Sequence, residues 1–187
     1  MNRAHTALEA IEAIDRARQA GFRDLTIDLI YGTPTLTDAA WEENLRILGS
    51  LDLPHFSAYS LTVEPRTALD KMVKEGRAPA PDDEKSTRQF LRLADWARSN
   101  GFLHYEISNF AKPDRYSRHN TAYWRGVPYL GIGPSAHSFD GDSRQWNVSN
   151  LSGYISAIEK GIVPSEKEIL SPSQKFNEYV MTGLRTK

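Results

Sequence analysis

The alternation of helix and strand patterns near the start of the chain restricts the fold more than any other feature of this sequence. Apolar residues at helical spacing predict a helix over residues 7–20, and the apolar run 25–30 predicts a strand buried on both faces. A second pair follows: Thr37 is placed to cap a helix, and residues 56–63 predict another strand. Helices and strands that alternate with such short connections are typical of parallel βα units, which predicts an α/β fold.

The rest of the chain carries further patterns. In chain order, they predict helices over 69–74 and from Asp82 or Asp83 to Gly101, a strand over 103–107, a weak strand over 145–148, and helices capped by Asn150 and Ser171. The segment 116–141 has no sustained period, and its histidines, aromatic residues and glycines predict a long irregular loop that handles a ligand. So few strands predict an incomplete βα barrel; the alternative is a small complete α/β domain.

Composition excludes several classes of protein. A formal net charge of −1 argues against a nucleic-acid or membrane partner held by overall charge. The chain has no cysteine, which excludes disulfides and thiolate metal sites within it. No long apolar run and no signal-peptide pattern are present, which predicts a cytoplasmic protein without a transmembrane segment.

Asp28 is the first candidate site residue. Side chains alternate along a strand, so Asp28 shares a face with Thr26 and Ile30. A carboxylate in a buried strand needs a partner. That partner is either a ligand or, with equal weight, a backbone amide or arginine of the protein itself.

His119 and Tyr123 form the second candidate site. They are four residues apart, so a single helical turn would bring the imidazole and the phenol to one side. A neutral imidazole flanked by aromatic rings suits axial ligation of haem iron and stacking on a porphyrin. The residues alone favour the alternative, a structural histidine.

Four blocks of sequence together resemble one known family. They are Met1-Asn2-Arg3-Ala4-His5, residues 27–34 (IDLIYGTP), residues 57–61 (SAYSL) and residues 105–111 (YEISNFA). In this order they are similar to the radical S-adenosylmethionine family of oxygen-independent coproporphyrinogen III oxidases and their haem-chaperone relatives. The resemblance covers nearly the whole chain, and it implies an incomplete radical S-adenosylmethionine barrel, similar to a TIM barrel, with a C-terminal loop and helix extension.

One motif within the resemblance favours the haem-chaperone branch. Residues 119–124 read HNTAYW and match the H-N-x-x-Y-W pattern of that branch, which the true oxidases lack. The resemblance implies haem binding by His119, Asn120, Tyr123 and Trp124, with His119 as the iron ligand, and delivery of haem to acceptor proteins. The alternative is an enzyme that decarboxylates two propionates of coproporphyrinogen III. A third reading is a fragment that retains no intact ligand site.

The resemblance also implies an S-adenosylmethionine site. Arg3 and Asp28 match the family pattern at that site, and Ile30, Thr62 and His137 fall where the family lines the same pocket. The family holds a four-iron four-sulfur cluster on three cysteines near its N-terminus. This chain has none, so it is expected to be the later part of a longer protein whose cluster ligands lie outside it.

The resemblance predicts a division into two regions and a set of partners. Residues 1–109 would be the later part of the barrel, and residues 110–187 a truncated accessory region. The expected partners are haem or a porphyrinogen, a haem-acceptor protein that is membrane-associated in one version of the hypothesis, and a second copy in a homodimer.

Overall fold

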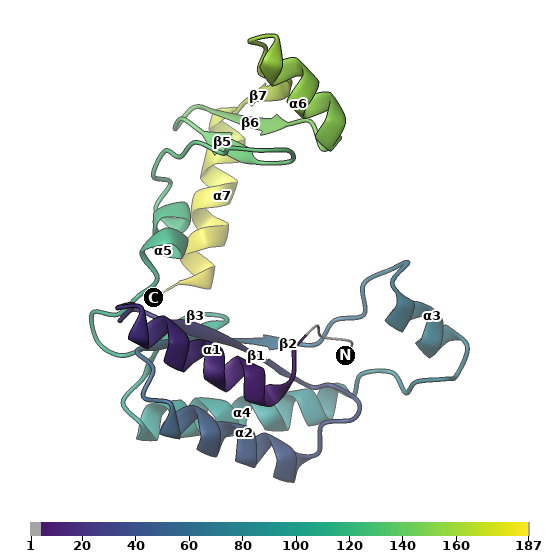
Figure 1. The fold of residues 1–187 in the computed structure, drawn as a ribbon, viewed down its shortest axis with the longest axis vertical. Coiled ribbons are helices and arrows are strands. Elements are labelled where there is room, and N and C mark those ends of the chain that lie inside the picture. Colours follow the sequence, from purple (N-terminus) through teal and green to yellow (C-terminus); the bar gives the residue numbers. More distant parts are fainter. Residues whose placement is uncertain (1–4, 187) are drawn as a thin grey trace. The chain divides into compact units, whose positions relative to one another are not determined.

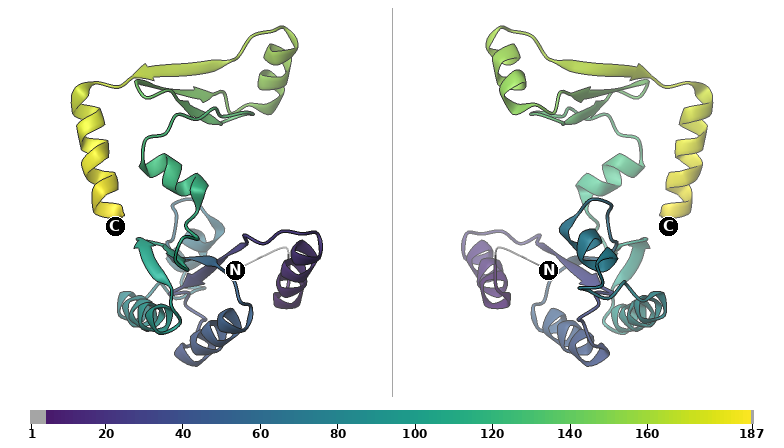
Figure 2. Two further views of the ribbon diagram at one scale, coloured as in Figure 1. Left: turned by 90° about the vertical axis from the view of Figure 1, so that its left-hand side faces the viewer. Right: turned by 90° about the vertical axis from the view of Figure 1, so that its right-hand side faces the viewer.

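The structure is a computed structural model that describes residues 5–186. It divides into a first unit, residues 1–116, and a second unit, residues 117–187. Figures 1 and 2 show their helices and strands. The first unit extends beyond the boundary at residue 109 predicted from the sequence, and the assignment of barrel and accessory regions stays a prediction.

The first unit contains a mixed four-stranded sheet. Its elements are α1 Ala7–Gln19, β1 Thr26–Tyr31, α2 Asp38–Ser50, β2 His55–Ser60, α3 Ala68–Lys74, α4 Asp83–Ser99, β3 Leu103–Glu106 and β4 Asn109–Ala111. The strand order is β1-β2-β4-β3; β1 and β2 are parallel, and β4 is antiparallel to both of its neighbours. The three strands predicted from the sequence therefore run in one direction. The sequence did not predict β4, which is only three residues long.

The core of the first unit lies between its sheet and the pair α2 and α4, which cover the same face (Figure 2). Helical spacing brings Trp41, Leu45 and Leu48 to one side of α2. These residues form a buried cluster with Phe56, Ala58, Leu93, Ala97 and Phe110.

A buried glutamine fixes the turn at the end of β1. The Gln89 side chain accepts a hydrogen bond from the backbone N–H of Gly32 at 2.8 Å, and its backbone carbonyl accepts one from the Trp41 indole at 2.9 Å. Gly32 has a φ of +72°, and a Cβ there would lie 2.3 Å from Oγ of Ser86. Glycine is therefore required, and the turn ties β1 to both α2 and α4.

The second unit contains a three-stranded antiparallel sheet and three helices. Its elements are α5 Arg118–Trp124, β5 His137–Phe139, β6 Ser143–Asn147, α6 Leu151–Glu159, β7 Ser165–Ile169 and α7 Pro172–Arg185. The predicted caps Asn150 and Ser171 are confirmed. The prediction that residues 116–141 form an irregular loop is wrong in part, because this segment contains α5 and β5. Both elements are too short to show a period in the sequence.

The overall class is therefore mixed α/β, as the sequence predicts, while the incomplete barrel stays a prediction. Among residues 5–186, none of the helices combines the length and apolar composition that a bilayer crossing requires.

Candidate functional site

One face of the first unit's sheet is polar, whereas the opposite face packs into the core. Side chains alternate along β1, so Ile27 packs against the core cluster while Thr26 and Asp28 lie on the other face. The parallel register pairs Thr26 with His55 and Asp28 with Ser57. Two neighbouring strands therefore present polar side chains side by side.

A hydrogen-bonded histidine joins three strands on this face. His55 is 5% exposed, its Nδ1 lies 2.7 Å from the Thr26 hydroxyl, and its Nε2 lies 2.7 Å from the Tyr105 hydroxyl. Burial lowers the pKa of His55, and the negative charge of Asp28 opposes this shift. The imidazole is consequently neutral near pH 7, with both ring nitrogens hydrogen-bonded.

A second chain of hydrogen bonds continues across β2 and β4. The Ser57 hydroxyl donates to Oδ1 of Asn109 at 3.0 Å, and Nδ2 of Asn109 donates to Oε2 of Glu106 at 2.5 Å. All three side chains are buried. Sequence reasoning did not connect these three residues, although the alternation of His55 and Ser57 along β2 was a signal that could have suggested a polar face.

Asp28 is exposed on this face and forms no hydrogen bond or ion pair with another residue of the described range 5–186. The expectation that β1 is buried on both faces is therefore wrong, because Thr26 and Asp28 are exposed on the polar face. An exposed carboxylate needs no internal partner, so its oxygens are accessible to a ligand.

The other residues predicted for the S-adenosylmethionine site are placed as follows. Ile30 lies on β1, two residues beyond Asp28 and half-buried. Thr62 lies beyond the end of β2, where it is exposed and donates to Glu64, so the predicted strand over 56–63 ends too late. Arg3 lies outside the described residues. His137 begins β5 in the second unit and is exposed.

The predicted haem residues lie on α5, which Ser117 caps. The rings of His119 and Tyr123 meet edge to face, with centroids 4.7 Å apart, so the expected helical turn brings them to one side. Asn120 is half-buried, and its backbone N–H donates to the Ser117 hydroxyl at 3.3 Å.

An open cavity of about 850 Å³ lies in the second unit beside α5. Such a volume is within the usual range of about 300–1,000 Å³ for small-molecule sites. Tyr123 and Trp124 line it, whereas His119 and Asn120 are not part of its wall. Its other aromatic and aliphatic lining includes Tyr129, Phe139, Leu170 and Tyr179.

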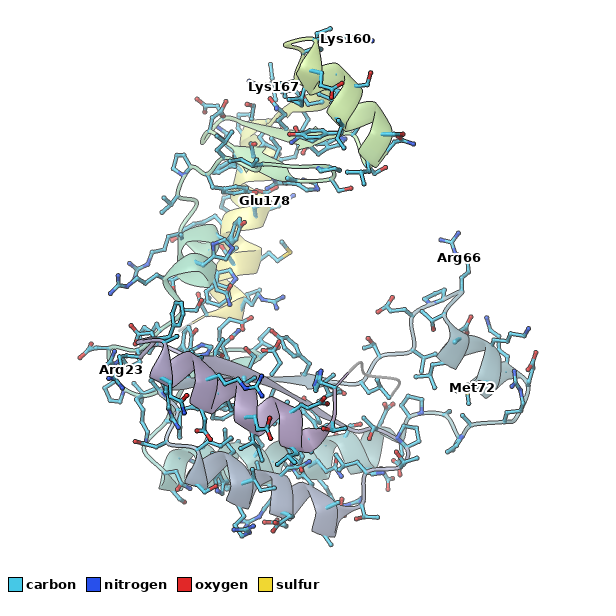
Figure 3. All side chains as sticks on the ribbon, viewed as in Figure 1. Arg23, Arg66, Met72, Lys160, Lys167 and Glu178 are labelled. Atoms are coloured by element: carbon cyan, nitrogen blue, oxygen red, sulfur yellow. The ribbon has the colours of Figure 1, made fainter. Side chains whose placement is uncertain are left out.

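Three cations also line this cavity, and they differ in how they are paired. Arg144 forms an ion pair of 2.6 Å with Glu178 of α7, which Figure 3 labels, and Lys175 pairs with Asp142. Arg125 forms no side-chain hydrogen bond or ion pair with any residue in the range 5–186. Arg125 is therefore the cation of this cavity that remains free to meet an anion.

The side chains present fit some of the groups that the resemblance implies. An iron–sulfur cluster does not fit, because the chain has no cysteine. Within residues 5–186, no group of three or more histidine and acidic side chains could hold a metal ion. Haem suits the aromatic cavity and the nearby imidazole of His119, and S-adenosylmethionine suits the free carboxylate of Asp28.

The chain is similar to known heme chaperones and to a radical S-adenosyl methionine domain-containing protein. The chain is 33% identical over 186 residues to the heme chaperone HemW of Bacillus subtilis, covering 99% of this chain and 49% of that protein. It is 32% identical over 191 residues to HemW of Lactococcus lactis, covering 100% of this chain and 49% of that protein. It is also 34% identical to a mitochondrial radical S-adenosyl methionine domain-containing protein of Bos taurus, covering 100% of this chain and 44% of that protein.

A solved structure shares the fold. Coproporphyrinogen III oxidase (HemN) from Escherichia coli, described as a radical SAM enzyme, matches with a TM-score of 0.77 at 22% identity, covering 99% of this chain and 45% of that one. No family model matches the chain. The chain thus spans about half the length of the relatives that it matches. The recognition made from sequence motifs is confirmed: this is a HemW-like chain of the radical S-adenosylmethionine, coproporphyrinogen-oxidase-like family.

Proposed function

We propose that this chain is the haem-binding part of a haem chaperone of the radical S-adenosylmethionine class, and that the complete protein delivers haem to acceptor proteins. Similarity to HemW proteins over nearly the whole chain supports this proposal. The observation that carries it is the edge-to-face contact of His119 with Tyr123, beside a cavity that Tyr123 and Trp124 line.

Each residue of this site has a distinct role in the proposal. His119 would supply an imidazole nitrogen to the haem iron, and it is exposed on α5 and therefore accessible. Tyr123 and Trp124 provide flat apolar surfaces for the macrocycle. Asn120, half-buried next to His119, would contribute to the haem contacts that the motif implies. Because the haem is cargo, an exposed ligand that releases its iron readily suits the task better than a buried one.

The S-adenosylmethionine site is part of the same proposal. Asp28 would accept hydrogen bonds from hydroxyl or amino groups of the cofactor, and Arg3 would meet its carboxylate or a ribose oxygen. Ile30, Thr62 and His137 would line the same site. The polar sheet face would then form the interior of an incomplete barrel made by residues 1–109, with residues 110–187 as the accessory region, and the cluster ligands would lie outside this chain.

The proposed partners and cellular location rest on the same family resemblance. The direct partners would be haem and a haem-acceptor protein, which would be membrane-associated in one version of the hypothesis. The homodimer and the cytoplasmic location stay predictions.

An anaerobic haem titration followed by absorbance tests the proposal. The expected result is a Soret shift that saturates at one haem per chain and is lost in His119→Ala. His5→Ala, which removes an exposed histidine from the first unit, is the matched control and should behave as the unchanged protein.

Identical spectra for His119→Ala and the unchanged chain would contradict the proposed iron ligand. The alternative function is oxidative decarboxylation of coproporphyrinogen III. It would gain support if a cluster-containing longer form converted that substrate under anaerobic reducing conditions while the haem spectrum did not depend on His119.

A further inference from the structure

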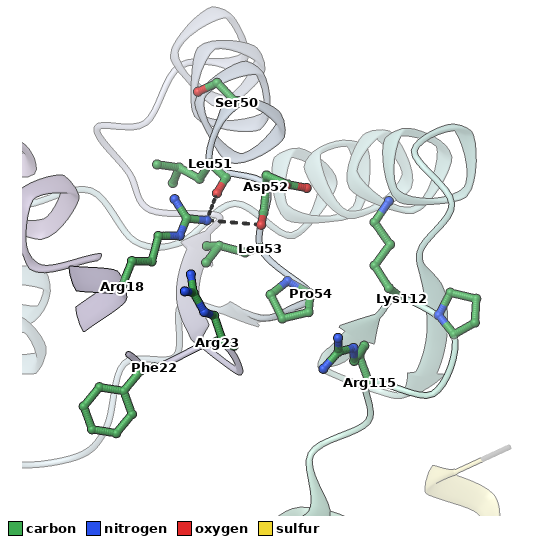
Figure 4. Close-up of a pocket in the computed structure, with 11 residues that line it drawn as sticks. Arg18, Phe22, Arg23, Ser50, Leu51, Asp52, Leu53, Pro54, Lys112 and Arg115 are labelled. Carbon is green, nitrogen blue, oxygen red and sulfur yellow. Dashed lines mark hydrogen bonds between the residues drawn. The ribbon is translucent and has the colours of Figure 1, made fainter. Parts of the chain in front are cut away.

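The first unit has an open cavity of about 530 Å³ at the end of its sheet where β1 and β2 begin (Figure 4). Four segments form it: the last turn of α1, the residues that precede β1, those that precede β2, and those that follow β4. The proposed S-adenosylmethionine residues Ile30 and Thr62 lie at or beyond the other ends of the same parallel strands. This cavity is therefore a separate site.

Positive charge predominates in this cavity. Arg18, Arg23, Lys112 and Arg115 line it, whereas Asp52 is its one acidic lining residue. The chain as a whole carries a formal net charge of −1, so this excess of cations is local. Arg115 is ion-paired with Asp24, and the Lys112 ammonium donates to the backbone carbonyl of Asn100. Arg18 and Arg23 have no carboxylate partner among the described residues, so a bound anion would meet uncompensated charge there.

Arg18 is held in place before any ligand arrives. Its Nη2 donates to the backbone carbonyl of Asp52 at 3.2 Å and also to that of Leu51, so the guanidinium joins α1 to the end of α2. A guanidinium has five N–H donors, and these two bonds leave most of them unused. Arg18 is thus a pre-ordered donor at the wall of the cavity.

Arg23 is the uncommitted cation beside it. It forms no hydrogen bond or ion pair with any described residue, and Figure 4 shows it between Arg18 and Pro54. Across the cavity, Arg115 pairs with the exposed Asp24 at 2.5 Å, and Lys112 lies over the Phe102 ring at 4.3 Å from its centroid. Guanidinium groups therefore approach the cavity from both sides.

We infer that this cavity binds the phosphate group of a small phosphorylated molecule, with Arg18 and Arg23 on one side of the oxyanion and Arg115 on the other. Planar guanidinium forks match the geometry of phosphate oxygens and bind them in pairs. The volume exceeds that of a phosphate alone and lies within the range of small-molecule sites, so the rest of the ligand has room. Pro54 and Pro113 offer rigid apolar surfaces to that remainder.

Isothermal titration calorimetry at constant ionic strength tests this inference, with inorganic phosphate, pyrophosphate and adenosine monophosphate as separate probes. We expect at least one probe to bind saturably and Arg23→Gln to weaken its binding about tenfold, or about 1.4 kcal/mol, because the variant loses a charge-assisted hydrogen bond to the phosphate. Arg23 has no internal partner, so its loss should leave folding intact. The matched control is Arg77→Gln, an exposed arginine after α3 that pairs with Glu75 and should change nothing.

The probes also distinguish the source of the phosphate. Tighter binding of adenosine monophosphate than of inorganic phosphate would support a ligand with an organic part, and equal binding would support recognition of the phosphate group alone. Pyrophosphate should raise the melting temperature of the unchanged chain more than that of Arg23→Gln. No saturable binding of any probe, or equal affinities in Arg23→Gln and Arg77→Gln, would overturn the inference.

Discussion

We assign Arg125 to the proposed haem site because its charge is unpaired within the described residues, not because it is part of a sequence motif. It lines the cavity of the second unit and has no side-chain partner among residues 5–186, while haem carries two propionates that need cations. Arg125→Gln is expected to weaken haem binding about two- to fivefold, because an exposed ion pair contributes about 0.2–1 kcal/mol. The Soret maximum should not move, since the iron ligand is unchanged.

Haem dimethyl ester provides the control for Arg125. The ester lacks the propionate charges, so Arg125→Gln should bind it as the unchanged chain does. Arg118→Gln changes an exposed arginine at the start of α5 that does not line the cavity, so it should leave haem affinity unchanged. An equal loss of affinity for haem and for its ester would show that Arg125 acts through packing instead.

His55 should make the stability of the chain depend on pH. Burial lowers its pKa in the folded state, whereas in the unfolded state the pKa returns to about 6.5. Below about pH 6.5 the unfolded state therefore binds more protons than the folded state does. The free energy of unfolding decreases as pH falls through this range. The contribution of His55 to the free energy of unfolding should be fully present above about pH 7 and should decrease toward about pH 5.5.

Urea unfolding at several pH values tests the role of His55. His55→Gln removes the titrating group, so the free energy of unfolding should change less between pH 7 and 5.5 than in the unchanged chain. The comparison rests on the slope with pH, because the variant also loses hydrogen bonds at every pH. An unchanged slope would contradict the burial of a neutral imidazole.

At the scale of elements, α4 shows how one face of a helix is selected. Leu93 is 0% exposed in the core cluster, whereas Leu91 on the same helix is 57% exposed. Leu93→Ala should lower the free energy of unfolding by about 2–5 kcal/mol through lost burial and a new cavity. Leu91→Ala, the same substitution in the same helix, should cost about 0.5 kcal/mol or less.

Denaturant midpoints of these two leucine variants, measured at one pH, check the orientation of α4. Comparable losses would mean that the helix packs with a different face. The turn after β1 belongs to the same arrangement, because Gln89 of α4 bonds to Gly32 at the end of that strand. A rotated α4 would break that bond as well.

At the scale of the whole molecule, the missing cysteines set what this chain can do without further segments. Anaerobic treatment with iron and sulfide, followed by desalting, should leave no iron–sulfur cluster on it, because such clusters need thiolate ligands. Iron and sulfide analysis measures this directly. Stoichiometric retention of both would contradict the expectation and would require ligands of another kind.

The sequence by itself determined the longer helices, the three longer strands of the first unit and the family. Helix caps are local signals, read from a few neighbouring residues. The caps predicted at Thr37, Asn150 and Ser171 are present, and so are the helices that they begin. The pairing of His119 with Tyr123 was equally local, since helical spacing fixes it. The motif blocks identified the family because they depend on residue identity in order, not on geometry.

Only the tertiary structure decided which distant residues meet. The register of β1 on β2 and the antiparallel insertion of β4 bring His55, Tyr105 and Asn109 onto one polar face. The exposure of Asp28 and the cationic cavity of Arg18, Arg23 and Arg115 have the same origin. These features depend on contacts between segments far apart in the chain, whereas helix caps and strand periods depend on near neighbours alone.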